Sequence, residues 1–221
     1  VAKQLLRQRG VRIQAYALAI GGIRAEQCDL TSIESNPVRC PDPAAARAME
    51  AAILAAKEQK DSLGGIIELR ITGVPAGLGD PVFGKLDARL ASALLSIGAT
   101  TGFEIGAGFA AADMRGSQSN DPLGTAGFLS NNAGGIIGGI STGNEIAIRV
   151  AIKPTSSIEK PQRTIDVDGR EREVTVEGRH DPCIVPRVVP VIEAMAALVL
   201  LDAWEMQTGL RPDWSGAALS A

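Results

Sequence analysis

One lysine and three hydroxyl residues occur together in the segment 153–157, which reads KPTSS and directly follows an alternating apolar stretch ending at Ile152. Lysine supplies positive charge, and serine and threonine supply hydrogen bonds, so this combination suits a phosphate group. Pro154 restricts the backbone and would hold the polar side chains at the end of a strand. A Ser/Thr-rich surface loop is the alternative that these residues leave open.

A second polar segment places an arginine, the chain's one histidine and an aspartate side by side, at Arg179, His180 and Asp181. Buried charges are costly without partners, so these side chains cannot all point into a core. They could serve proton transfer, or they could form a solvated turn in which Asp181 caps the next helix. A single histidine excludes a metal site built only of histidines, and we expect no metal site.

Five glycines lie within ten residues of the segment 131–144. Glycine lets the backbone approach a ligand closely and lets N–H groups converge on an anion. The spacing fits neither the P-loop nor the dinucleotide-binding motif. The segment is therefore either a ligand-binding loop or a tight glycine turn between strands.

The strands that must position these segments follow from a period of two in the apolar residues. Asp168-Gly169 lies between two alternating stretches and predicts a hairpin over 164–176. Residues 116–127 predict a long polar loop instead. Without a regular alternation of strands and helices, the pattern favours the α+β class over a doubly wound sheet. The other strands are expected at 11–20, 66–73, 103–109 and 146–152.

Two aspartate-proline pairs predict helix starts, with aspartate as the N-cap and proline in the first turn. Asp42-Pro43 precedes an amphipathic stripe that ends near residue 60, and Asp80-Pro81 precedes a stripe that begins at Val82.

A third, strongly apolar helix is expected over 190–208. Pro190 would stand at its start and Gly209 would provide its C-terminal cap. Since the stretch is apolar almost throughout, we expect the helix to be buried on most of its sides.

The chain has 221 residues, of which 45% are hydrophobic and 21% charged, and its formal net charge is −3. This composition predicts a globular chain with a sizeable core and gives no basic surface for nucleic acid or an anionic membrane. The longest apolar run, Val191–Leu201, is too short to cross a bilayer. The cysteines, with no metal-binding spacing, predict reduced thiols in a cytoplasmic compartment; they are Cys28, Cys40 and Cys183.

Three long blocks together resemble the chorismate synthase family. They read GDPVFGKLDARLASALLSIGATTGFEIGAGF at 79–109, SNNAGGIIGGISTG followed by KPTSSI, and GRHDPCIVPRVVPVIEAMAALVLLD at 178–202. The resemblance implies an α+β fold with helices sandwiched between antiparallel sheets. It also implies elimination of phosphate from 5-enolpyruvylshikimate 3-phosphate to give chorismate with reduced FMN, an association with NADP, and a homotetramer. Whether the enzyme or a separate reductase reduces the flavin stays open.

The resemblance also implies roles for individual residues. Asp181 would be the catalytic carboxylate that helps flavin N5 to remove a proton, and Arg179 would contact flavin and substrate. His180 would be structural. The remaining FMN contacts would come from Gly98, Ala99, Gly138, Lys153, Pro154, Thr155, Ser156 and Ser157.

Motifs of the family's N-terminal part, which carry two catalytic histidines, are absent here. We therefore expect residues 1–221 to be the C-terminal three-fifths of a single chorismate synthase domain, inactive by itself. Two other readings stay open: a non-catalytic flavin- or phosphate-binding module built on 131–157, and an oligomerisation domain built on the apolar helix 190–208.

Overall fold

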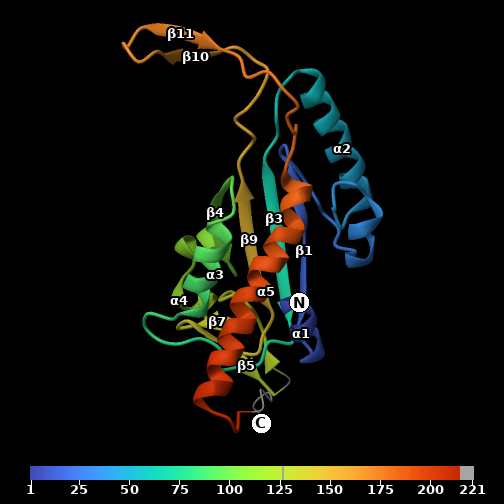
Figure 1. Ribbon diagram of the computed structural model, residues 1–221. Helices are drawn as coiled ribbons and strands as arrows, with labels where there is room; N and C mark the ends of the chain where they lie inside the picture. Colours follow the sequence, from blue (N-terminus) through green and yellow to red (C-terminus); the bar gives the residue numbers. More distant parts are fainter. Residues whose placement is uncertain (126, 215–221) are drawn as a thin grey trace. The chain divides into compact units, whose positions relative to one another are not determined.

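The computed structural model describes residues 1–125 and 127–214, which form two compact units. The first unit comprises 1–15, 68–150 and the residues from 189 onward, and the second comprises 16–67 and 151–188. Helices and strands occur in both units, so the predicted α+β class is confirmed (Figure 1).

The largest sheet has five strands in the order β2-β1-β3-β9-β4. Apolar side chains of β9 are buried alternately, as the period of two predicts, with Ile146 and Val150 at 0% exposure. Three of the strands run from one unit into the other. The bounds are β1 Arg12–Ile20, β2 Ile23–Arg24, β3 Gly65–Thr72, β4 Thr100–Ile105 and β9 Ile146–Ile152.

In the second unit, the predicted helix start at Asp42-Pro43 is confirmed by α2 (Pro43–Glu58). One carboxylate oxygen of Asp42 accepts hydrogen bonds from the backbone N–H groups of Ala44 and Ala45. The other oxygen accepts from the N–H groups of two residues that precede η1 (Leu30–Ser35). These hydrogen bonds lower the pKa of the Asp42 carboxyl, and the bond from the N–H of Ala45 contributes most.

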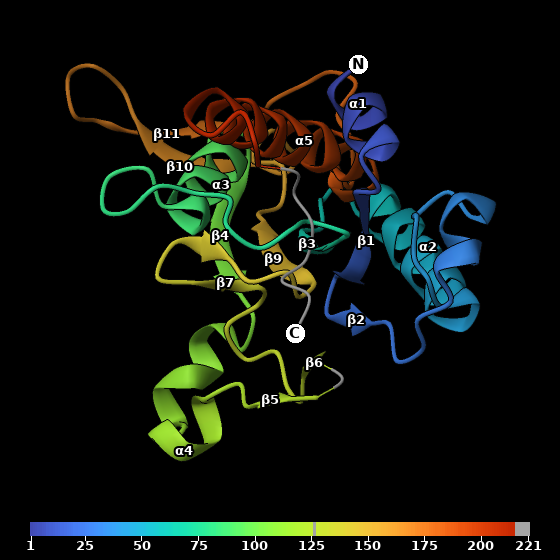
Figure 2. The same ribbon diagram turned by 90° about the horizontal axis from the view of Figure 1, so that it is seen from below.

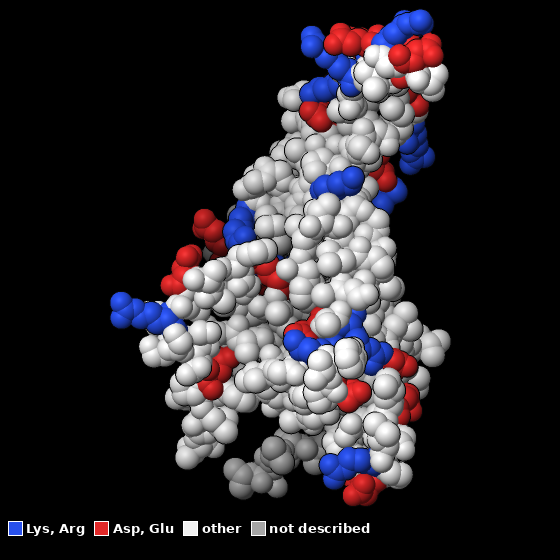
Figure 3. Space-filling view, turned by 90° about the vertical axis from the view of Figure 1, so that its left-hand side faces the viewer, with Lys and Arg blue, Asp and Glu red and all other residues white. Residues whose placement is uncertain are grey.

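The predicted hairpin is also confirmed in the second unit, by β10 (Gln162–Ile165) and β11 (Glu171–Val174). Every residue of both strands is exposed. Acidic and basic side chains gather around this hairpin, at the top of Figure 3. Asp166 organises its turn by accepting hydrogen bonds from the backbone N–H groups of Asp168 and Arg170.

The first unit contains α1 (Ala2–Gln8), α3 (Leu86–Leu95) and most of α5 (Val185–Leu210). The segment predicted as a polar loop contains short elements, and it extends away from α3 and β4 (Figure 2). The bounds are η2 Gly108–Asp113, α4 Gly116–Ser119, β5 Leu123–Gly124, β6 Gly127–Phe128, β7 Ile136–Ile137 and β8 Ile140–Ser141.

The helix start predicted at Asp80-Pro81 is wrong, because α3 begins only at Leu86. The residues in between close a turn in which the N–H of Asp80 donates to the carbonyl of Gly84, 3.1 Å away. Val82 is 72% exposed and therefore does not belong to the buried stripe. The strand predicted over 103–109 is shifted as well, since β4 ends at Ile105.

The predicted limits of the last helix are also wrong. Pro190 lies inside α5 and Gly209 belongs to its last turn. The buried side chains of Val185, Val188 and Val189 extend the apolar face upstream of the proline, and this burial compensates the one backbone hydrogen bond that proline removes.

The expectation that α5 is buried on most of its sides is not met either. Val191 is 42% and Leu198 56% exposed, so the helix buries one face and leaves apolar residues on the other. No helix in the described ranges combines the length and apolarity needed to cross a bilayer. All three cysteines are free thiols, and burial raises the pKa of both Cys40 and Cys183.

Candidate functional site

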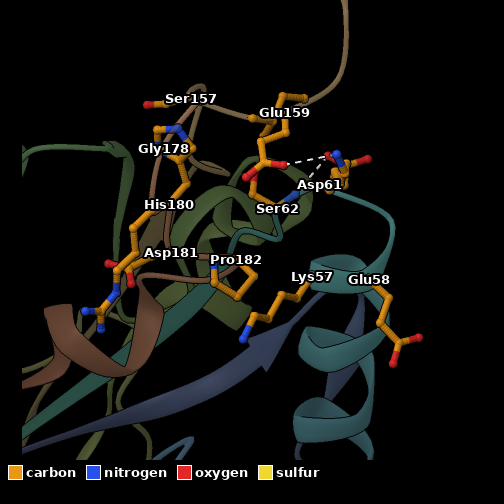
Figure 4. Close-up of a pocket in the computed structure, with 13 residues that line it drawn as sticks. Lys57, Glu58, Asp61, Ser62, Ser157, Glu159, Gly178, His180, Asp181 and Pro182 are labelled. Carbon is orange, nitrogen blue, oxygen red and sulfur yellow. Dashed lines mark hydrogen bonds and ion pairs between the residues drawn. The ribbon is translucent and has the colours of Figure 1, made fainter. Parts of the chain in front are cut away.

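Three segments of the second unit enclose a cavity of about 300 Å³ (Figure 4). They are the end of α2 with the connection to β3, the loop that follows β9, and the turn that precedes α5. They include Arg179, His180 and Asp181 of the second polar segment but, of the KPTSS segment, only Ser157. The lining residues are Lys57, Glu58, Lys60, Asp61, Ser62, Ser157, Ile158, Glu159, Gly178, Arg179, His180, Asp181 and Pro182.

Lysine and arginine side chains supply the positive charge of this cavity. Lys60 Nζ lies 3.2 Å from Glu159 Oε2, so its charge is compensated. Lys57 and Arg179 make no ion pair within the part of the chain that the structure describes. These two cations are thus the groups that an anionic ligand could use.

On one side of the cavity, Asp61 Oδ2 accepts a hydrogen bond of 2.5 Å from Lys160 Nζ. Asp61 Oδ1 accepts another from the backbone N–H of Ser62 at 2.8 Å. The bond from Lys160 is the larger cause, and the two together lower the pKa of the Asp61 carboxyl. Asp61 therefore stays ionised and ties the end of α2 to the residues after the KPTSS segment.

The turn before α5 is fixed through side-chain and backbone contacts. Asp181 Oδ2 lies 2.7 Å from Arg187 Nη1 in the first turn of α5, so its carboxylate is held by a charged partner. His180 Nε2 lies 3.2 Å from the carbonyl oxygen of Val176. The carbonyl of Pro182 accepts from the N–H of Leu63 at 2.7 Å. The side chain of Arg187 is 68% exposed, so solvent weakens its ion pair with Asp181.

In the KPTSS loop, polar groups remain available to a ligand. Thr155 Oγ1 is buried and has no hydrogen-bond partner in the described residues. A buried hydroxyl without a partner is costly unless a ligand or water satisfies it. Of the other polar residues in this loop, only Ser157 lines the cavity, while Lys153 and Ser156 are exposed outside its lining.

The backbone of this loop lies against the connection between α2 and β3. Ser62 is buried, and its Oγ donates to the carbonyl of Thr155 at 2.6 Å. A Cβ placed on Gly64 would lie 2.4 Å from the carbonyl oxygen of Ile152 and 2.9 Å from Pro154 Cδ. Only glycine permits this approach. Sequence reasoning missed both Ser62 and Gly64, and only the adjacent glycines 64 and 65 hinted at a close backbone contact there.

Of the predicted FMN contacts, only Ser157 and Arg179 line the cavity. Gly98, Ala99 and Gly138 belong to the first unit. Gly98 and Ala99 lie in the turn between α3 and β4. Gly138 and Gly139 form the turn between β7 and β8, with φ of +62° and +88°. Two successive positive φ values are typical of a type I′ hairpin, so residues 138–139 form a tight turn between two strands. A Cβ on Gly138 would meet nothing within 4 Å.

Comparison with known proteins agrees with the three sequence blocks. The family model described as chorismate synthase matches residues 1–204. A chorismate synthase of Syntrophobacter fumaroxidans is 52% identical over 202 residues, which are 91% of this chain and 58% of that protein. A chorismate synthase of Methanosarcina mazei is 54% identical over 211 residues, which are 91% of this chain and 58% of that protein.

A solved crystal structure of chorismate synthase is similar with a TM-score of 0.77 and 31% identity, and the match covers 94% of this chain and 61% of that one. The chain thus spans about three-fifths of the length of the relatives it matches. The chain belongs to the chorismate synthase family.

Proposed function

We propose that this chain is the flavin-phosphate-binding portion of a chorismate synthase, the enzyme that converts 5-enolpyruvylshikimate 3-phosphate to chorismate and phosphate with reduced FMN. The observation that carries the proposal is the buried, unpartnered hydroxyl of Thr155 beside the exposed lysine of the KPTSS loop. The family relationship supports the reaction class. Residues 1–221 would then be part of a single domain, and the matched relatives contain further residues of that domain.

The residues present fit a flavin phosphate. Lys153 would supply charge to it, and the hydroxyls of Thr155, Ser156 and Ser157 would supply hydrogen bonds. The buried hydroxyl of Thr155 would gain the partner that it lacks. Arg179 and Lys57, which have no ion-pair partner among the described residues, would balance the negative charge of cofactor or substrate. Gly98, Ala99 and Gly138 are proposed to contact the flavin from the first unit.

When bound, reduced FMN supplies transient electron density that loosens the substrate's phosphate, and the overall reaction has no net oxidation or reduction. Asp181 is the proposed catalytic residue of this chain, and its carboxylate would help to take up the departing proton. Arg187, 2.7 Å away, orients the carboxylate. In the overall balance, the substrate loses one proton and one phosphate group and gains one carbon–carbon double bond.

The wider properties proposed here follow from the family. They are a homotetrameric assembly of the whole enzyme, a cytoplasmic location, and a small phosphorylated substrate, with neither nucleic acid nor membrane as partner. The exposed apolar face of α5 would suit burial in such an assembly. The association with NADP would concern the reduction of the flavin.

Calorimetric titration with FMN and with riboflavin tests the proposal, because the two ligands differ only in the phosphate. We expect the chain to prefer FMN and to form no chorismate by itself. Equal affinity for both ligands would contradict the assigned phosphate loop. Turnover by this chain alone, near that of a full-length relative, would contradict the proposed division of the enzyme.

The carboxylate is tested in the full-length protein. Asp181→Asn keeps the size of the side chain but removes its capacity to take a proton. We expect turnover to fall far more than FMN affinity. If turnover of the FMN-loaded variant stays unchanged, Asp181 does not have the proposed role. FMN binding without chorismate formation, even when the N-terminal part is supplied separately, would favour a non-catalytic flavin-binding module.

A further inference from the structure

The loop that carries the proposed phosphate ligands is held by a neighbouring segment that the sequence analysis did not single out. We propose that Ser62 is a positioning residue, which holds the 153–157 loop in the conformation that binds phosphate. This inference rests on the proposed function, since it assumes that the loop binds the phosphate of FMN. Ser62 itself would not touch the ligand.

The main evidence for this role is a hydrogen bond of 2.6 Å, in which the Ser62 hydroxyl donates to the carbonyl oxygen of Thr155. Ser62 is only 9% exposed, so water competes little for this bond. The bond holds the carbonyl of the same residue whose Oγ1 is buried without a partner. Fixing the backbone at Thr155 therefore limits where its hydroxyl can point.

The entry to the loop is held by shape rather than by a hydrogen bond. The missing side chain of Gly64 lets the carbonyl of Ile152 and the ring of Pro154 approach to distances that a Cβ would not allow. Ser62 and Gly64 are two residues apart in one extended connection, so they contact successive parts of the loop. The loop backbone between Ile152 and Thr155 is thus in contact with this connection at both ends.

Beyond the loop, two ion pairs continue the same attachment. Asp61 pairs with Lys160 at 2.5 Å, and Lys60 pairs with Glu159 at 3.2 Å. The remaining member of the connection, Leu63, donates its N–H to Pro182 in the turn that carries Asp181. The residues 60–64 therefore contact both segments that the proposed function uses.

A purely structural serine would contribute to stability but not to the choice between ligands. A positioning serine would contribute to the preference for FMN over riboflavin, because only FMN places a phosphate in the loop. The two roles therefore differ in the ratio of the two affinities, even if both lower the melting temperature.

The experiment uses Ser62→Ala in this 221-residue chain, with FMN and riboflavin as probes. We expect the FMN-to-riboflavin affinity ratio to fall about 3- to 10-fold, the effect of one neutral hydrogen bond. Amide hydrogen exchange in 153–160 should become faster without any ligand. Ser62→Thr, which keeps the hydroxyl, should restore both. Ser32→Ala is the matched control, since Ser32 is also 9% exposed and its Oγ donates to the carbonyl of Pro41 at 2.9 Å.

Each result decides between these roles. Unchanged hydrogen exchange in 153–160 would overturn the positioning role of Ser62, whether or not ligand binds. Faster exchange with an unchanged affinity ratio, in a chain that prefers FMN, would also overturn it. If the unsubstituted chain does not prefer FMN to riboflavin, the proposed function fails, and the inference about Ser62 is overturned with it.

Discussion

The KPTSS loop and the glycine turn between β7 and β8 are both candidate ligand-binding segments in the sequence. They differ in whether their polar groups find hydrogen-bond partners within the fold. At the turn, Gly138 and Gly139 adopt the positive φ angles of a tight hairpin, and the carbonyl of Gly139 accepts from the N–H of Leu86 at 2.8 Å. In the loop, a buried hydroxyl has no partner. Asp87 Oδ1 and Thr100 Oγ1 in the first unit are also buried without a partner in the described residues, so Thr155 becomes a candidate contact only together with the neighbouring Lys153 and serines.

The largest effect is expected at Lys153. Lys153→Ala removes the loop's charge, and hydrogen bonds to charged groups contribute more than neutral ones, so FMN affinity should fall about 10- to 100-fold. Affinity for riboflavin should stay unchanged in the same calorimetric titrations. The control is Lys3→Ala, which removes a lysine that pairs with Glu193 in the first unit. Equal losses for FMN and riboflavin would show that Lys153 does not contact the phosphate.

At the glycine turn, substitution should change stability and leave ligand preference alone. Gly139→Ala forces a side chain into φ +88° and places its Cβ 2.4 Å from Lys85 Cγ. We expect a loss of about 1–2 kcal/mol in the free energy of urea unfolding. Gly10→Ala is the matched control, because Gly10 has φ +84° but open space around its Cβ. A change in the FMN-to-riboflavin ratio would show that this turn contacts the phosphate.

A pair of threonines tests the contrast directly. Thr142 Oγ1 donates to the carbonyl of Gly135 at 3.2 Å, whereas Thr155 Oγ1 has no partner in the described residues. Thr142→Val should therefore lower the free energy of unfolding by about 1 kcal/mol without changing FMN binding. Thr155→Val should weaken FMN binding about 2- to 10-fold and, because it removes a buried hydroxyl that has no partner, should raise the free energy of unfolding. The comparison fails if Thr155→Val destabilises the chain as much as Thr142→Val does.

Local signals predicted the elements better than the contacts that complete the site. Asp42-Pro43 and the alternation of β9 were interpreted correctly because a helix cap and a period of two depend on neighbouring residues. Asp80-Pro81 carries the same cap signal, but there the chain closes a turn, with a backbone bond from Asp80 to Gly84. A local pattern does not distinguish these two outcomes.

Contacts between distant residues could not be predicted from the sequence alone. The bond from Ser62 to Thr155 joins residues 93 positions apart. The polar segments themselves were recognisable, since lysine with hydroxyls and arginine beside aspartate are unusual in packed sequence. Which neighbours hold them depends on tertiary packing, as the pairing of Asp181 with Arg187 also shows.

The smallest expected effect is on the pH dependence of stability, which should involve the KPTSS loop and not the glycine turn. Asp61, which pairs with Lys160 beside the loop, has its pKa lowered, first by that hydrogen bond and then by the backbone N–H of Ser62. Because the folded-state pKa lies below the ordinary value of 3.8, the pair stabilises the fold above that value. This stabilisation is lost as the pH falls through the folded-state pKa. The bond between Leu86 and Gly139 joins backbone atoms that do not titrate.

Both side chains of the pair are partly exposed, at 43% for Lys160 and 39% for Asp61, so solvent screens the interaction and its contribution should stay under about 1 kcal/mol. Urea unfolding of the chain and of Asp61→Asn between about pH 5 and pH 2 measures it. Asp61→Asn should be less stable at the upper end of this range, and the difference should vanish at the lower end. A constant difference across the range would mean that Asp61 contributes through its hydrogen-bond geometry alone, and that ionisation is not what secures the loop.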